Sequence, residues 1–310
     1  MKEIIVLEMV KKIRKRTKTK RWGGRKLYVL IKEEIAGSIL KIGRDKLFDL
    51  LRENGMLVRP RKRRYFTTQS HHWLRKYENL IENLVINQPN QLWVSDITYV
   101  KINHEVHYLY LITDAYSQKI VGVHISTDLK ATSATIALQR ALKDNPVKQP
   151  YGLIHHSDRG IQYCSEEYTG ILNKHKILIS MTRPASPQEN AIAERINGIL
   201  KDEWLYDLKL ERNENPYKKI KGIIKIYNQI RPDNSLGNLT PNQVHHKGFL
   251  RHKDERVIGK LYRYRKQADI QKCQPEKNNY AIVPNDYSLA SCSPAELASA
   301  SSWHCKYDLN

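Results

Sequence analysis

Long hydrophobic runs are absent from this sequence. No apolar stretch approaches the roughly 18 residues that a membrane-spanning helix requires. The apolar run at residues 4–7 is interrupted by Glu8 too soon to act as a signal peptide. These two absences predict a protein that stays in the cytoplasm and has no membrane partner.

Cysteine is scarce, with four residues in a chain of 310. A cytoplasmic protein keeps such thiols reduced, so structural disulfides are not expected. The spacing of the cysteines matches no zinc-binding motif, and the sequence therefore predicts ordinary thiols. They are Cys164, Cys273, Cys292 and Cys305.

Acidic residues are outnumbered by basic ones. The chain has 32 Asp and Glu against 53 Lys and Arg, which gives a formal charge of +21 at pH 7. So large an excess favours a polyanionic partner, and nucleic acid is the first candidate. Positive charge is densest in the first 90 residues, and a chain of this length suits two or three modules.

The basic N-terminal part divides into three segments. Residues 1–21 form a leader, partly helical, which the charge density favours as a DNA-contacting arm over a solvated charged face. Residues 22–58 contain two amphipathic helical patterns and a basic turn, which indicate a helix-turn-helix-like module or a bare helical hairpin. Residues 59–88 are a basic linker, either solvated or lying along a phosphate backbone through Arg61, Lys62, Arg63 and Arg64.

A mixed α/β core is predicted over residues 89–245. Antiparallel strands are followed by alternating strands and helices, a pattern typical of a mixed sheet. The expected strands are 91–100, 105–114, 119–126, one ending at Asp158, and 177–183; the expected helices are 131–143, 165–174 and one containing Glu194. Residues 246–310 are predicted to be a basic and then irregular tail, either disordered or irregular from residue 265.

Three carboxylates carry the strongest functional signal. Asp96 lies in an alternating, strand-like run, Asp158 ends a second such run, and Glu194 follows after 35 intervening residues. Hard divalent cations take oxygen ligands, and two-metal phosphoryl-transfer sites need several carboxylates. The three residues therefore predict a metal-dependent phosphoryl-transfer site.

The helix around Glu194 separates its polar and apolar residues. Asn190, Glu194, Asn197 and Lys201 follow one another at steps of four, three and four, so they share one face. That face could bind metal at one end and a DNA phosphate at the other, or it could be a solvated surface stripe. The opposite, buried stripe consists of Ile192, Ile196, Ile199 and Leu200.

These motifs together resemble a known family. The chain is similar to the integrase catalytic core of bacterial insertion-sequence transposases, and more narrowly to the second-frame product of the insertion sequence 3 family, whose relatives include retroviral integrases. The resemblance covers about residues 22–245. It rests on Trp93–Tyr99, His156–Gly160, Asn190–Arg195 with Lys201 seven residues after Glu194, Tyr227–Pro232 and Leu239–Pro241.

The resemblance implies a fold and an activity. The fold would be ribonuclease-H-like, with Asp96 on the central strand, Asp158 on the strand beside it and the Glu194 helix across their ends. The activity would be cleavage and transfer of the 3′ ends of an insertion sequence with two Mg²⁺ or Mn²⁺ ions. Asp96 would bridge the ions, with Asp158 on one and Glu194 on the other.

Partners follow from the same resemblance. They are DNA, as element ends and as target, other copies of this chain on that DNA, and a separate first-frame protein with a helix-turn-helix. The enzymatic alternatives are a ribonuclease-H-like nuclease or a phage-type integrase. The binding alternative is an inactive, domesticated copy, against which the complete set of carboxylates argues.

Residues around the carboxylates are further candidates. His155 points away from the side of Asp158 and is expected to pack, whereas His156 shares that side and either orients a carboxylate or contacts DNA. Tyr227, on a later helix, could stack on DNA but is expected to pack against the core. The candidate DNA contacts are Arg159, Arg195, Asn197, Lys201 and Arg231.

Overall fold

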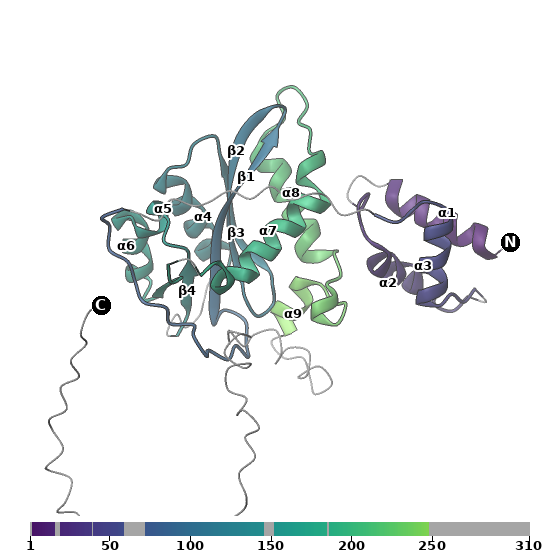
Figure 1. Ribbon diagram of the computed structural model, residues 1–310, viewed down its shortest axis with the longest axis horizontal. Coiled ribbons are helices and arrows are strands. Elements are labelled where there is room, and N and C mark those ends of the chain that lie inside the picture. Colours follow the sequence, from purple (N-terminus) through teal and green to yellow (C-terminus); the bar gives the residue numbers. More distant parts are fainter. Residues whose placement is uncertain are drawn as a thin grey trace, which may run out of the picture. The chain divides into compact units, whose positions relative to one another are not determined.

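The computed structural model describes residues 2–15, 19–38, 40–58, 72–145, 152–184 and 186–247 (Figure 1). Arg61, Lys62, Arg63 and Arg64 of the basic linker lie outside these ranges, as does the tail from residue 248 onward, so their predicted roles remain predictions. Within the described ranges, no helix is both long enough and apolar enough to cross a membrane.

Three helices form a small N-terminal module. They are α1 (Lys2–Lys15), α2 (Gly24–Glu34) and α3 (Arg44–Glu53). The apolar stripe of α1 packs into one core with the other two helices, so the leader predicted to be separate is structurally part of this module. The buried residues of that core are Val6, Val10, Ile13, Leu27, Ile31, Leu47, Leu50 and Leu51.

A five-stranded mixed sheet is the centre of the following region. The strand order is β3-β2-β1-β4-β5, so β1 lies in the middle. The first three strands pair antiparallel, whereas β4 pairs parallel with β1, and β5 pairs parallel with β4. This confirms the predicted mixed α/β sheet. The strands are β1 (Leu92–Ile102), β2 (Glu105–Asp114), β3 (Ile120–Ser126), β4 (Ile154–Ser157) and β5 (Leu178–Met181).

Helices lie on both faces of this sheet (Figure 1). The α-helices are α4 (Ala131–Asp144), α5 (Ile161–Cys164), α6 (Glu166–Lys174), α7 (Ala191–Glu203), α8 (Pro216–Gln229) and α9 (Pro241–Lys247). Three short 3₁₀ helices join them: η1 (Pro187–Asn190), η2 (Leu205–Asp207) and η3 (Asn234–Leu236).

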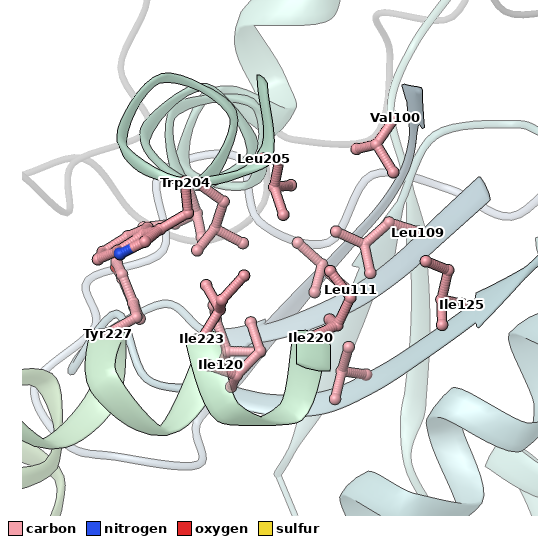
Figure 2. Close-up of a cluster of buried hydrophobic side chains, with 14 of the residues drawn as sticks. Val100, Leu109, Leu111, Ile120, Ile125, Trp204, Leu205, Ile220, Ile223 and Tyr227 are labelled. Carbon is pink, nitrogen blue, oxygen red and sulfur yellow. The ribbon is translucent and has the colours of Figure 1, made fainter. Parts of the chain in front are cut away.

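Alternation along the strands divides the core between the two faces. Trp93, Tyr110 and Ile112 face one way and pack against α4, α5 and α6. Val100, Leu109 and neighbouring residues face the other way. Figure 2 shows this second cluster, in which α8 and the segment directly after α7 cover the sheet through Trp204, Leu205, Ile220, Ile223 and Tyr227.

The register of β1 and β4 determines where the first two carboxylates lie. Val94 pairs with His156 in the parallel β1–β4 ladder. Parallel strands advance in step, so two residues further along both chains Asp96 comes beside Asp158. Asp96 has the same parity as Val94 and therefore faces the side of the sheet against which α7 packs.

Gly122 allows close contact between β3 and α4. A Cβ atom at this position would lie 2.6 Å from the carbonyl oxygen of Ala137 and 2.8 Å from the Cβ of Ala141. We expect Gly122→Ala to lower the free energy of unfolding by about 1–3 kcal/mol, because the helix must move away from the sheet.

A denaturant titration measures this effect, with Gly170→Ala as the matched control. Gly170 lies on the exposed side of α6 with open space around it. Alanine there is expected to raise the free energy of unfolding by about 0.5–1 kcal/mol through helix propensity. Equal effects of the two substitutions would contradict the close approach at Gly122.

Candidate active site

Asp96 and Asp158 are held by hydrogen bonds that fix their carboxylates. Asp96, in the middle of β1, accepts from the backbone N of Ile97 at 2.9 Å through Oδ1 and from Nδ2 of Asn197 at 2.6 Å through Oδ2. Asp158 follows β4 and accepts from the backbone N of Gly160 at 2.9 Å. The sheet and its first flanking loop thus present two oriented carboxylates.

Asp96 interacts electrostatically with each of the other two predicted carboxylates. The pKa of Asp96 is raised from its usual 3.8 to about 7, first by burial and then by the negative charge of Asp158, with a smaller contribution from Glu194. The side chain of Glu194 is more exposed, and partial burial raises its pKa as well. The site therefore concentrates negative charge around Asp96.

The helical period predicts Asn197 on a DNA-facing surface, and the structure shows that this prediction is wrong. It is 5% exposed, because this face of α7 packs against β1, and its Nδ2 donates to Asp96. Asn190 is buried in the same way and donates to the backbone oxygen of Ser95 at 3.0 Å. The predicted shared face exists, but it packs against the sheet, and its two asparagines donate hydrogen bonds to β1.

Lys201 lies one further turn along the same face. Its Nζ is 4.5 Å from the centroid of the Tyr99 ring, a cation–π contact. Burial lowers the pKa of Lys201, and the charge of Asp96 opposes that decrease. Sequence reasoning missed Tyr99 as a neighbour of Lys201. Helix-to-strand contacts of this kind leave no periodic signal, and only the position of Tyr99 three residues after Asp96 pointed to the site.

The two histidines before Asp158 are buried structural residues. Nε2 of His155 lies 2.9 Å from the hydroxyl of Tyr168, and the two rings meet edge to face, which confirms the predicted packing role. Nδ1 of His156 lies 2.9 Å from Oγ of Ser180 on β5. Burial lowers the pKa of His155 to about 3 and that of His156 to about 4, so both rings are neutral. Because His156 is fully buried, it is not a DNA contact.

Arg231 was wrongly predicted to contact phosphate. It is 4% exposed, and its guanidinium pairs with Glu203 at 3.0 Å and with Asp233 at 2.7 Å. This buried network connects the end of α7 to the loop after α8, so the guanidinium is already fully engaged. Tyr227 is buried beside it and donates to the backbone oxygen of Gln118, which confirms its predicted packing role.

Arg159 and Arg195 remain partly exposed. Arg159 donates from Nε to the backbone oxygen of Thr182 at 2.7 Å. Arg195, 40% exposed, pairs with Asp233 at 3.1 Å and also donates to Ser235. Both side chains have protein partners and exposed surface, so their predicted DNA contacts remain predictions.

The donor chemistry of the site fits hard divalent cations. Among the described residues, no group of three or more His, Cys, Asp and Glu side chains is spaced to hold one ion. A two-ion arrangement needs only pairs of carboxylates for each ion, and Asp96 interacts electrostatically with both Asp158 and Glu194. A bound cation would lower the pKa of Asp96 again, because a nearby positive charge favours the ionised carboxylate.

The burial of Asp96 beside other carboxylates predicts that the free energy of unfolding depends on pH when metal is absent. The folded pKa of Asp96 exceeds its unfolded value, so the free energy of unfolding falls as the pH rises from about 4 through about 7. Asp96→Asn removes the charge, and the free Oδ1 of Asn197 can turn to accept from the new amide. We expect the variant to be more stable than wild type at pH 8 by roughly 1–3 kcal/mol.

Urea titrations in EDTA at pH 5 and pH 8 measure this difference. The advantage of the variant should shrink at pH 5, where the folded wild type keeps its proton on Asp96. Excess Mg²⁺ should stabilise wild type and not the variant. An advantage that is equal at both pH values would mean that the substitution acts by packing and not by charge.

Comparisons with known proteins agree with this geometry. Residues 86–187 match the integrase core domain family, and residues 175–241 match a second integrase core domain family. The insertion element IS600 uncharacterized 31 kDa protein of Shigella sonnei is 33% identical over 213 residues, covering 68% of this chain and 78% of the relative. Transposase InsF for insertion sequence IS3A of Escherichia coli K12 is 33% identical over 203 residues, covering 64% and 69%.

Solved structures that match part of this chain include integrase catalytic core domains. The HTLV-2 integrase catalytic core domain in complex with magnesium is 22% identical, with a TM-score of 0.41, and the match covers 51% of this chain and 98% of that one. A chain from the structure of the simian T-cell lymphotropic virus intasome in complex with PP2A regulatory subunit B56 gamma is 18% identical with a TM-score of 0.46, covering 77% of this chain and 76% of that one. The integrase core domain match and the central position of β1 together confirm the predicted ribonuclease-H-like fold.

Proposed function

Because this chain belongs to the insertion-sequence transposases with an integrase core domain, we propose that it cleaves the 3′ ends of its own element and joins them to target DNA by direct transesterification. Enzymes of this type are polynucleotidyl transferases that use a metal-dependent set of Asp, Asp and Glu. The proposal assigns those positions to Asp96, Asp158 and Glu194. It rests on the β1–β4 register, which brings Asp96 beside Asp158, and on the electrostatic interaction of Asp96 with Glu194 in the first turn of α7.

Each of the three carboxylates has a proposed role as a metal ligand. Asp96 is the shared ligand of two Mg²⁺ or Mn²⁺ ions, with Asp158 on one ion and Glu194 on the other. Bound ions would activate the attacking oxygen and neutralise charge at the scissile phosphate. Asn197 keeps the Asp96 carboxylate in one orientation through its 2.6 Å hydrogen bond.

Lys201 is the proposed phosphate contact beside the metal ligands. Its ammonium group lies over the Tyr99 ring and within the field of Asp96, so it is restrained near the carboxylates. A phosphate between Lys201 and the ions would meet positive charge from both sides. Arg159 and Arg195 are proposed as outer contacts to the DNA backbone, because each keeps an exposed part of its guanidinium.

Partners are proposed on the same basis. The chain would act on element ends and on target DNA as a homo-oligomer, since one end must be held at each of two active sites. One solved chain that is similar to this one comes from a simian T-cell lymphotropic virus intasome. A separate first-frame protein with a helix-turn-helix is proposed to assist in recognising the element ends.

A strand-transfer assay with the purified full chain tests the proposed function. The substrates are a labelled duplex carrying an element end and an unlabelled target plasmid, with Mg²⁺, Mn²⁺ or EDTA. The proposal predicts labelled plasmid that forms only with a divalent ion. Cleavage without joining would favour the nuclease alternative, and DNA binding without either step would favour an inactive copy.

A further inference from the structure

An ion pair between Arg183 and Glu189 joins the end of β5 to the turn that precedes α7, the helix that carries Glu194. Arg183 follows β5, and Glu189 lies in η1, immediately before α7. The backbone N of Arg183 donates to Oε2 of Glu189 at 2.7 Å, and Nε of the same arginine donates to Oε1 at 2.7 Å. One residue thus engages both oxygens of a carboxylate that is only 9% exposed.

The balance of forces on Glu189 shows that the pair holds it ionised. Burial alone would raise the pKa of Glu189, but hydrogen bonds from the backbone and guanidinium of Arg183 outweigh that effect, and the pKa is lowered. The outer edge of Arg183 also pairs with Glu82 at 2.9 Å. Glu82 is half-exposed, so this second pair is screened by solvent and contributes less.

The next residue attaches the same turn to the strand of Asp96. Asn190, which is buried, donates from Nδ2 to the backbone oxygen of Ser95 at 3.0 Å, and Ser95 directly precedes Asp96. Two consecutive residues of η1 are therefore anchored, Glu189 to the end of β5 and Asn190 to β1. The helix begins at Ala191 and carries Glu194 in its first turn.

We propose that Arg183 and Glu189 are positioning residues that set the start of α7 and so hold Glu194 within metal-sharing reach of Asp96. This inference rests on the proposed function of the three carboxylates. Glu194 lies in the first turn of α7, so a shift or fraying of the start of the helix would move Glu194 most. Asn197 and Lys201 lie further from the anchor. The Arg183 side chain is 39% exposed, so the pair acts locally more than on global stability.

The test uses Arg183→Met and Glu189→Gln, with Arg183→Lys as the conservative variant. The matched control is Lys219→Met, which removes the ion pair between Lys219 and Glu214, also 2.7 Å long but on α8. Two quantities are measured on the full chain: amide hydrogen exchange along η1 and α7, and the Mn²⁺ concentration that gives half-maximal strand transfer.

Arg183→Met and Glu189→Gln should each speed amide hydrogen exchange at the first turn of α7 and leave exchange in β2 and α8 unchanged. They should raise the half-maximal Mn²⁺ concentration roughly 10-fold, as loss of outer partners of metal ligands does, without changing the affinity for DNA. Arg183→Lys should fall between wild type and Arg183→Met. The double variant should be no worse than either single one, because both remove the same interaction.

Three outcomes would overturn the proposal. These are unchanged exchange at the start of α7, faster exchange throughout the sheet, and a Mn²⁺ requirement no different from that of the Lys219→Met control. Failure of the proposed function gives a different result, because wild type itself would then transfer no strands. The exchange data would still decide whether the ion pair sets the start of α7.

Discussion

Asp96→Asn, Asp158→Asn and Glu194→Gln are each expected to reduce strand cleavage and transfer by roughly 10³-fold or more. Each substitution removes one ligand charge and keeps nearly the same side-chain volume. DNA affinity should change little, because no basic residue is altered. The measurements are metal-dependent nicking and joining of end-containing DNA, beside a binding titration at the same salt concentration.

Glu105→Gln is the matched control for these three variants. Glu105 begins the inner strand β2 and its side chain is 77% exposed, so the same loss of charge occurs on an exposed side chain at the end of a strand. Its activity should equal that of wild type. Substantial transfer by any one of the three site variants would remove that residue from the proposed metal site. Loss of activity in the control would point to a general effect of charge.

DNA affinity is expected to fall about 10³-fold or more between about 50 and 200 mM salt, because neutralised phosphates release their counterions. The N-terminal module is the proposed source of many of these contacts. Its helix α1 carries exposed Lys11, Lys12 and Lys15. Changing all three to Gln should flatten the slope of log K against log salt by up to about three units.

Glutamine substitution is preferable to truncation for this test. Val6, Val10 and Ile13 of α1 are buried against α2 and α3, so deletion of residues 1–21 would expose the core of the module. A charge-matched control changes Lys218, Lys221 and Lys225 on the exposed side of α8 to Gln. Equal flattening by both triple variants would indicate a contribution of overall charge rather than of contacts made by α1.

Sequence patterns predicted the elements that depend on local periodicity. Alternation located β1 around Asp96, and the run ending at Asp158 became β4, within a few residues of the expected limits. The 3.6-residue period located α7 and placed Asn190, Glu194, Asn197 and Lys201 on one face. Local periodicity is readable because it follows from backbone geometry alone.

The same periodicity could not predict which part of the protein or which partner a polar helix face contacts. A helix face with two asparagines, a glutamate and a lysine looks the same in sequence whether it faces solvent, DNA or another strand. Packing against β1 buried Asn197 and Asn190 and left Glu194 and part of Lys201 accessible. Arg231 was misread for a related reason, since its partners Glu203 and Asp233 are brought to it only by folding.

The sequence by itself determined the type of most main elements and the excess of positive charge, and it supplied the three candidate carboxylates, because these depend on residue type and spacing. Only the tertiary structure decided that α1 joins the helical module, that Asn197 orients Asp96 and that Arg183 anchors the turn before α7. Each of these contacts joins residues whose partner is chosen by packing. A side chain carries no local mark of that partner, because the contact exists only once the backbone has brought both groups together.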